Sequence, residues 1–120
     1  MTSLKGLRIL VVEDEMLVSM LLEDMLGDFG CVVVGPAPDL DEAMSLVEKG
    51  EIDAALLDVN VSGRPIFPVA DALRERGVPY IFASGYGEAG LTDAHRGAPV
   101  LQKPFRQADL ERTLTALVAS

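Results

Sequence analysis

The chain has 120 residues, of which 49% are hydrophobic, so it can bury the core of one domain of ordinary size. Its formal net charge is −9, from 10 basic and 19 acidic residues, which argues against direct nucleic-acid binding because that needs basic groups to neutralise phosphates. Charges and glycines interrupt the apolar runs well before the ~18 residues of a membrane span, and the N-terminus lacks the layout of a signal peptide. We therefore expect a single cytoplasmic domain, residues 1–120, that binds neither nucleic acid nor membrane.

Two short apolar runs flank a helical pattern near the N-terminus. Residues 7–12 and 31–34 are runs rich in β-branched residues, as in strands buried on both faces of a sheet. Residues 15–29 have apolar side chains at helical spacing, which we expect to face the core. That stripe consists of Leu17, Met20, Leu21 and Met25, and the chain's methionines, including Met16 and Met44, fall mostly at core spacing and imply no cofactor.

A capping pattern precedes the second predicted helix. Asp39 stands three residues before Glu42, as in a capping box. The helix ends at Gly50, and its apolar stripe is Leu40, Ala43, Met44 and Val47. The chain's single cysteine, Cys31, lies in the apolar run before this helix, so we expect it to be a buried small hydrophobe without a disulfide partner.

A third strand and a third helix are predicted in the middle of the chain. Residues 54–57 form the strand, which ends at Asp58, and a loop over residues 61–65 follows it. The helix spans residues 68–76, and the side chains that it turns inward are Val69, Ala72 and Leu73.

The last third of the chain contains two more predicted strands, residues 80–83 and 100–102. Residues 85–97 between them are glycine-rich and weakly patterned, so we expect any helix there to be short or mobile. Residues 107–118 form the final helix, with the stripe Leu110, Leu114, Leu117 and Val118. Strand and helix thus alternate five times, which predicts an α/β fold, a doubly wound parallel sheet with helices on both faces.

Polar side chains follow four of the predicted strands at the point where each strand ends. In an open parallel sheet, ligands bind beyond these carboxyl ends. The residues delivered there are Glu13 and Asp14 after the first strand, Asp58 and Asn60 after the third, Ser84 and Gly85 after the fourth, and Lys103 and Pro104 after the fifth.

This set of side chains suits a magnesium site beside a phosphoryl acceptor. Carboxylates crowded together repel one another unless a cation joins them, and Mg²⁺ prefers oxygen ligands. Asp14 and Asp58 can ligate the ion directly, and the longer Glu13 can hold a coordinated water. A carboxylate beside Mg²⁺ can attack a phosphoryl group, for which Lys103 offers a cation and Ser84 a hydroxyl.

With these residues in view, the chain resembles the receiver domain of bacterial response regulators over essentially its whole length. The matching pieces are the acidic pair after RILVV, Asp58 after DAALL, Ser84 after PYIFA, and the Lys-Pro pair in LQKPF. The resemblance implies a flavodoxin-like (βα)5 fold with strand order 2-1-3-4-5.

The resemblance also assigns roles at the site. It implies that Asp58 is the phosphoacceptor, that Asp14 ligates Mg²⁺ with help from Glu13, and that the backbone carbonyl of Asn60 is a further ligand. Ser84 would bind a phosphoryl oxygen and follow it on activation. Lys103 would pair with the phosphoryl group, and the peptide bond between Lys103 and Pro104 would be cis.

The sequence departs from the usual family pattern at three places, which bear on the output switch. Val61 and Ser62 replace a common Met-Pro pair, and Leu101 replaces an aromatic switch residue. The stretch Phe82-Ala-Ser-Gly-Tyr86 is similar to a subgroup with a Phe-Ala-Thr-Gly-Tyr signature. Gly85 and Tyr86 are therefore candidate switch residues, although Tyr86 could equally be a packed loop aromatic.

The leading hypothesis is a stand-alone receiver that is not an enzyme but assists its own phosphorylation and dephosphorylation. A histidine kinase or phosphotransfer protein would donate the phosphoryl group. The output would be binding to a downstream protein or removal of phosphate from a shared pathway. We expect the only histidine, His95, to lie at the surface and not to act as a phosphodonor.

Two alternatives of other classes remain. An aspartate-nucleophile phosphatase similar to the haloacid dehalogenases would need an acidic residue at position 60, where Asn60 cannot transfer a proton, and a nucleophile after the first strand. A constitutive scaffold with the same fold would not need the intact set of Glu13, Asp14, Asp58, Ser84 and Lys103.

Overall fold

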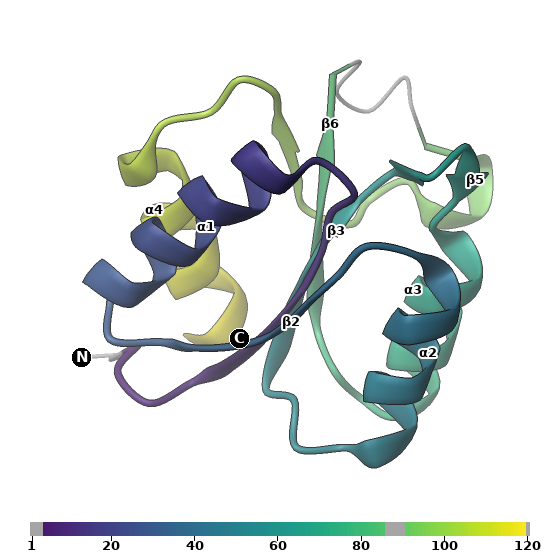
Figure 1. Cartoon of the computed structure of the whole chain (residues 1–120), viewed down its shortest axis with the longest axis horizontal. Helices are drawn as coiled ribbons and strands as arrows, with labels where there is room; N and C mark the ends of the chain where they lie inside the picture. Colours follow the sequence, from purple (N-terminus) through teal and green to yellow (C-terminus); the bar gives the residue numbers. More distant parts are fainter. Residues whose placement is uncertain (1–3, 86–90, 120) are drawn as a thin grey trace.

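The fold is an open five-stranded parallel sheet with two helices on each face (Figure 1). It is taken from a computed structural model, which describes residues 4–85 and 91–119. The strands of the main sheet are β1 (Arg8–Val12), β2 (Val32–Ala37), β3 (Ala54–Asp58), β6 (Tyr80–Ser84) and β7 (Val100–Gln102). Their order is β2-β1-β3-β6-β7, and all neighbours are parallel, which confirms the predicted topology.

Within the described residues, four α-helices cover the sheet, two on each side (Figure 1). They are α1 (Met16–Asp28), α2 (Leu40–Lys49), α3 (Phe67–Glu75) and α4 (Gln107–Ala119). Between β6 and β7, the described residues form only the short 3₁₀ helix Asp93–His95. This short helix agrees with the expectation that any helix in this segment would be short or mobile.

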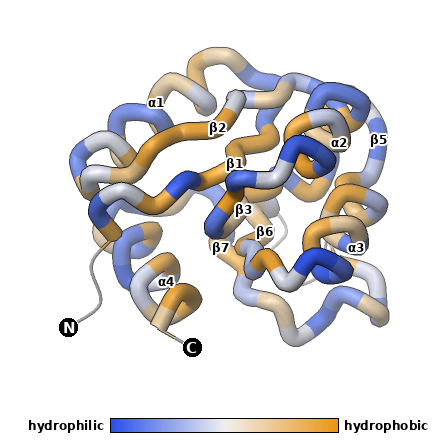
Figure 2. Tube along the Cα trace, turned by 90° about the horizontal axis from the view of Figure 1, so that it is seen from below, coloured by the Kyte–Doolittle hydropathy of each residue, from blue (hydrophilic) through white to orange (hydrophobic). Residues whose placement is uncertain are grey.

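Alternate residues of the central strands enter two separate cores, because successive side chains of a strand point to opposite faces. On β1, Leu10 and Val12 join the core beneath α2 and α3, whereas Ile9 and Val11 join the core beneath α1 and α4. Figure 2 shows the strands as predominantly apolar and the helices as mixed, as expected for a sheet covered on both faces. No helix within residues 4–85 and 91–119 is long and apolar enough to cross a membrane.

The helix stripes were predicted correctly for α2 and α4. Leu40, Ala43 and Val47 of α2 are buried, and the backbone N–H of Glu42 donates to the Asp39 side chain at 2.8 Å, as predicted for the cap. Leu110 and Leu114 are buried on α4. Cys31 is buried too, as expected.

The predicted core stripe of α1 is wrong for Leu17, Met20 and Leu21, although Met25 packs against the core as expected. Met16 and Leu17 are 75% and 78% exposed, and Met20 and Leu21 are more than half exposed. The buried side chains of α1 are Ser19, Leu22 and Leu26. The first seven residues of α1 are apolar except for Ser19, so helical spacing alone could not indicate which side faces the sheet.

Two further features differ from the predictions. The loop after Asp58 contains a small antiparallel hairpin, β4 (Asn60–Val61) and β5 (Arg64–Pro65). His95 was expected at the surface but is buried, because its ring stacks on Phe67 with centroids 4.4 Å apart. Its Nε2 is also 2.8 Å from Oδ1 of Asp71 on α3.

Candidate functional site

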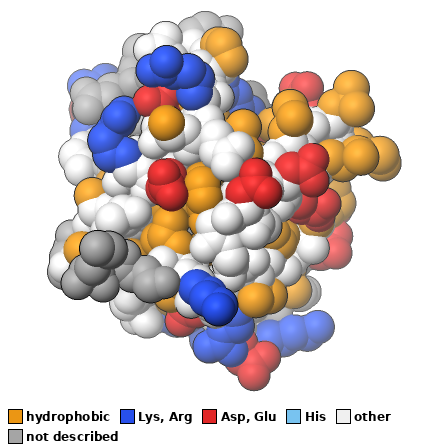
Figure 3. All heavy atoms as spheres, turned by 90° about the vertical axis from the view of Figure 1, so that its left-hand side faces the viewer, with side chains coloured by type: hydrophobic (Ala, Val, Ile, Leu, Met, Phe, Trp, Pro, Cys, Tyr) orange, Lys and Arg blue, Asp and Glu red, His pale blue; other side chains and the backbone are white. Residues whose placement is uncertain are grey.

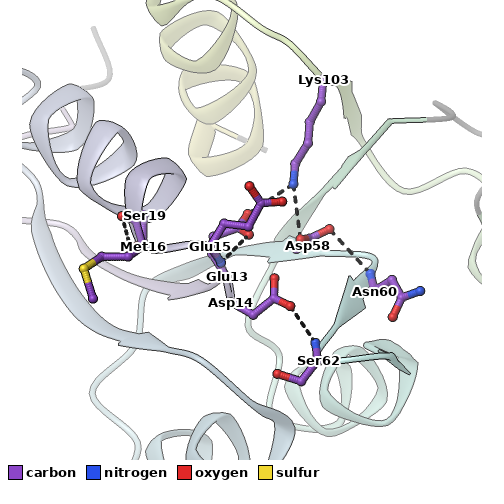
Figure 4. A network of polar contacts seen from close by, with 9 residues as sticks. All are labelled: Glu13, Asp14, Glu15, Met16, Ser19, Asp58, Asn60, Ser62 and Lys103. Carbon is purple, nitrogen blue, oxygen red and sulfur yellow. Dashed lines mark hydrogen bonds and ion pairs between the residues drawn. The ribbon is translucent and has the colours of Figure 1, made fainter.

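The predicted polar residues meet at the carboxyl edge of the sheet (Figure 4). Glu13 and Asp14 follow β1 directly, Asp58 is the last residue of β3, and Lys103 follows β7. Since these strands run parallel, their carboxyl ends lie along one edge, and the side chains after them converge.

Three carboxylates form the centre of the site. Glu13, Asp14 and Asp58 each offer one oxygen, and these oxygens all lie within 4.8 Å of one another. The Glu13 side chain is only 1% exposed, whereas Asp14 lies at the surface. The three ligands are hard oxygen donors close enough to share one ion, so the residues present fit Mg²⁺.

Lys103 lies between two of these carboxylates. Its Nζ is 3.1 Å from Oε2 of Glu13 and 3.2 Å from Oδ2 of Asp58. Burial tends to lower the pKa of Lys103, but the negative charges of Asp58 and Glu13 prevail and raise it above its ordinary value. The ammonium group therefore remains charged and partly neutralises the acidic cluster.

The environment of Glu13 favours the neutral form of its carboxyl, whereas that of Lys103 favours the charged form of its amine. Burial raises the pKa of its carboxyl, and the negative charge of Asp58 raises it further. The backbone N–H of Glu15, which donates to Oε1 at 3.1 Å, and the Lys103 ammonium lower it without cancelling the rise. A cation at this site would therefore relieve an existing repulsion between Glu13 and Asp58.

Backbone amides orient the other two carboxylates. The N–H of Ser62 donates to Oδ2 of Asp14 at 2.9 Å, and that of Asn60 makes a longer contact of 3.5 Å with Oδ1 of Asp58. The side chain of Asn60 points away from the carboxylates (Figure 4), and the role of its backbone carbonyl as a further Mg²⁺ ligand stays a prediction.

Ser84 and Lys103 adjoin each other through the backbone. Ser84 is buried at the end of β6, and its carbonyl accepts a hydrogen bond from the Lys103 N–H at 2.9 Å. The peptide bond between Lys103 and Pro104 is cis, as predicted. Gly85 follows β6 in a turn, and Tyr86, the remaining predicted switch residue, lies outside the described residues.

Two features of the site were not predicted. One is the contact from the β4–β5 hairpin, for which the Ser-Gly pair at 62 and 63 was an available turn signal. The other is a groove of about 400 Å³ beside Lys103, between α1 and the segment after β7. It is lined by Glu15, Val18, Leu21, Leu22, Met25, Lys103, Pro104 and Phe105.

Comparisons with known proteins agree with this geometry. A family model described as the response regulator receiver domain matches residues 9–115. The transcriptional regulatory protein PdtaR of Mycobacterium tuberculosis is 32% identical over 107 residues, which are 86% of this chain and 52% of PdtaR. The chain spans about half the length of the curated relatives it matches.

Solved structures share the fold over nearly the whole chain. The solution structure of SdrG from Sphingomonas melonis Fr1 matches with a TM-score of 0.82 at 41% identity, covering 98% of this chain and 99% of SdrG. The receiver domain of the sensor histidine kinase PA1611 from Pseudomonas aeruginosa PAO1 matches with a TM-score of 0.78 at 26% identity, covering 96% and 99%. The latter structure has a magnesium ion coordinated in its active site cleft.

Proposed function

The chain belongs to the response regulator receiver domain family, and from that membership we propose that it is a phosphorylation switch with Asp58 as its Mg²⁺-dependent phosphoacceptor. The observation that supports this role is the position of Asp58, which lies beside Glu13 and Asp14 on one side and the Lys103 ammonium on the other. The magnesium-bound PA1611 receiver domain supports the choice of metal.

The residues of the site account for the transfer step. Bound Mg²⁺ would neutralise the carboxylates and the incoming phosphoryl oxygens. A carboxylate oxygen of Asp58 attacks phosphorus, and a P–O bond forms while the P–N bond to the donor imidazole breaks, leaving the electron pair on nitrogen. Lys103 then exchanges its contact with Asp58 for one with the phosphoryl group. Attack by water on phosphorus later releases phosphate and restores the carboxylate.

We further propose that the phosphodonor docks on the exposed face of α1. This apolar face consists of Met16, Leu17, Met20 and Leu21, and it is continuous with the groove through Leu21. Figure 3 shows apolar and acidic side chains gathered together on this side of the molecule. A helix with apolar residues flanked by basic ones fits this surface, since the acidic flanks, which include Glu15, Asp24 and Asp28, would repel a second copy.

We propose a cytoplasmic, stand-alone domain whose output is binding to a downstream protein or drainage of phosphate from a shared pathway. The domain would be a phosphoacceptor and not an enzyme. Its similarity to SdrG, which this chain covers almost completely, supports the stand-alone arrangement.

Incubation with acetyl phosphate and Mg²⁺, followed by intact mass and released phosphate, tests the proposed chemistry. We expect one phosphoryl group per chain and slow release. Rapid multiple turnover would instead indicate a phosphatase, and a chain that gains no phosphoryl group under these conditions would indicate a scaffold.

A further inference from the structure

Ser62 has an unfavourable backbone conformation next to the cation site. Together with Gly63 it forms the two-residue turn of the β4–β5 hairpin, in which Val61 pairs with Arg64. Both turn residues have positive φ, +52° at Ser62 and +77° at Gly63, as a type I′ turn requires. Glycine adopts this region freely, but a residue with a side chain does so at a cost, and such residues persist where surrounding contacts fix them.

Two hydrogen bonds fix Ser62, and each reaches a different loop. Its N–H donates to Oδ2 of Asp14 in the β1–α1 loop at 2.9 Å, and its hydroxyl donates to the carbonyl of Pro38 in the β2–α2 loop at 3.0 Å. Ser62 itself lies in the connection from β3 to α3. One residue therefore joins three loops at the carboxyl edge of the sheet.

The amide contact restricts how Asp14 can face the other carboxylates. Ser62 approaches Asp14 from the side away from Lys103 (Figure 4), and Asp14 still presents an oxygen within 4.8 Å of Glu13 and Asp58. Because Asp14 is exposed, a fixed N–H donor helps to decide which way its carboxylate points.

We propose that Ser62 is a positioning residue for the cation site. Its amide orients the Asp14 carboxylate toward the ion, and its hydroxyl anchors the turn so that the amide stays in place. This inference rests on the proposed Mg²⁺ site. The backbone N–H of Ser62 makes the contact with Asp14. Proline at this position has no N–H and could not make it.

Three variants separate the amide from the turn. Ser62→Pro removes the amide donor and the hydroxyl, and it also breaks the turn, because proline fixes φ near −65° and cannot adopt the +52° of Ser62. Ser62→Gly keeps the amide and suits the positive φ but removes the hydroxyl. Gly63→Val is the matched control, because it strains the same turn at φ +77° while keeping the Ser62 amide, and a side chain at Gly63 meets no neighbouring atom within 4 Å.

We expect Mg²⁺ affinity, measured by calorimetric titration of the unphosphorylated protein, to fall about 10-fold or more in Ser62→Pro. It should fall less in both Ser62→Gly and Gly63→Val, because each keeps the Ser62 amide. A spectroscopic readout is independent of metal: in Asp14→Ala, the Ser62 amide proton should move upfield and exchange faster with water.

Several results would overturn the assignment. These are wild-type Mg²⁺ affinity in Ser62→Pro, an equal loss in Gly63→Val, or an unchanged Ser62 amide signal in Asp14→Ala. Wild-type protein that binds no Mg²⁺ would instead contradict the proposed metal site. Failure of the wild type to accept phosphate despite binding Mg²⁺ would contradict the proposed function and leave the role of Ser62 intact.

Discussion

At the scale of single residues, Asp58 is both the proposed nucleophile and a source of repulsion. Asp58→Asn removes the anionic nucleophile, so we expect phosphorylation by acetyl phosphate to be lost. The variant loses repulsion with Glu13 and an ion pair with Lys103, which offset each other, so its unfolding free energy should change by less than about 1 kcal/mol. The pKa of Glu13, followed by NMR, should fall because Asp58 raises it. Phosphate incorporation in Asp58→Asn would disprove the phosphoacceptor assignment.

The two neighbouring acidic residues should differ in their contribution to metal binding. Both oxygens of Glu13 are engaged, one with the Glu15 amide and the other with Lys103, whereas Asp14 is exposed to the solvent from which the ion arrives. Asp14→Ala should therefore weaken Mg²⁺ binding more than Glu13→Ala in parallel titrations. A larger loss in Glu13→Ala would reverse the two roles.

Lys103 should matter more for the response than for phosphorylation itself. Its contacts with Glu13 and Asp58 must rearrange when a phosphoryl group arrives, which couples the residue after β7 to the end of β3. We expect Lys103→Ala to accept phosphate while showing smaller amide shift changes with beryllofluoride than the wild type. A full set of shift changes in the variant would remove Lys103 from the switch.

Residues that together suit one reaction could be predicted from the sequence. The burial of a single residue was harder to predict. Asp58 and Lys103 were predicted because each follows a strand and both suit one reaction. The burial of His95 was not predicted, since Phe67 and Asp71, which hold its ring, are more than 20 residues away in sequence. Contacts at that separation follow from the fold and not from local pattern.

At the scale of secondary-structure elements, the two sides of α1 should respond differently to substitution. Leu26→Ala removes a side chain with no exposed surface and should lower the unfolding free energy by about 2–5 kcal/mol. Leu17→Ser alters a side chain that is 78% exposed and should change it by about 0.5 kcal/mol or less. Chemical denaturation of both variants measures this, and a large loss in Leu17→Ser would mean that the predicted stripe faces the core after all.

Transfer from a protein donor should be slower in Leu17→Ser, while transfer from acetyl phosphate should be unchanged.

The buried side of a helix could be predicted where only one side of that helix is apolar. The helix α2 has charged residues opposite Ala43 and Val47, so its buried side was evident from the sequence. The nearly continuous apolar start of α1 contains two overlapping stripes, and only the path of the chain over the sheet selects the one ending at Leu26. The β4–β5 hairpin was missed because strands of two residues leave no period to detect.

At the scale of the whole molecule, the site was predictable because the topology does most of the positioning. Five alternating strands and helices imply a parallel sheet, and a parallel sheet brings the carboxyl ends of its strands to one edge. The orientation of each side chain within the site was less accessible. It depends on loop amides such as that of Ser62, whose approach to Asp14 requires the turn and the sheet together.

The route by which a phosphorylation signal leaves the site is also a property of the whole molecule. Leu101 is buried in the core beneath α1 and α4 and has no ring or polar end, so moving it between core and solvent gains little. Ser84, by contrast, lies between Asp58 and Lys103 in strand order and leads directly into Gly85, which can adopt backbone states closed to other residues. The far end of this segment is tied to α3 through His95 and Asp71.

We therefore predict that phosphorylation makes Gly85 and the segment around His95 more rigid as Ser84 moves toward the phosphoryl group, and that this surface binds the downstream partner. Residues 86–90 lie outside the described residues, so the prediction concerns the two ends that the structure places, Gly85 and the His95 contact. Backbone amide relaxation with and without beryllofluoride measures the effect, and the imidazole resonances of the only histidine report on the anchored end. Equal rigidity of Gly85 and residues 91–97 in both states, with changes confined to Leu101 and β7, would show that the signal leaves through the fifth strand instead.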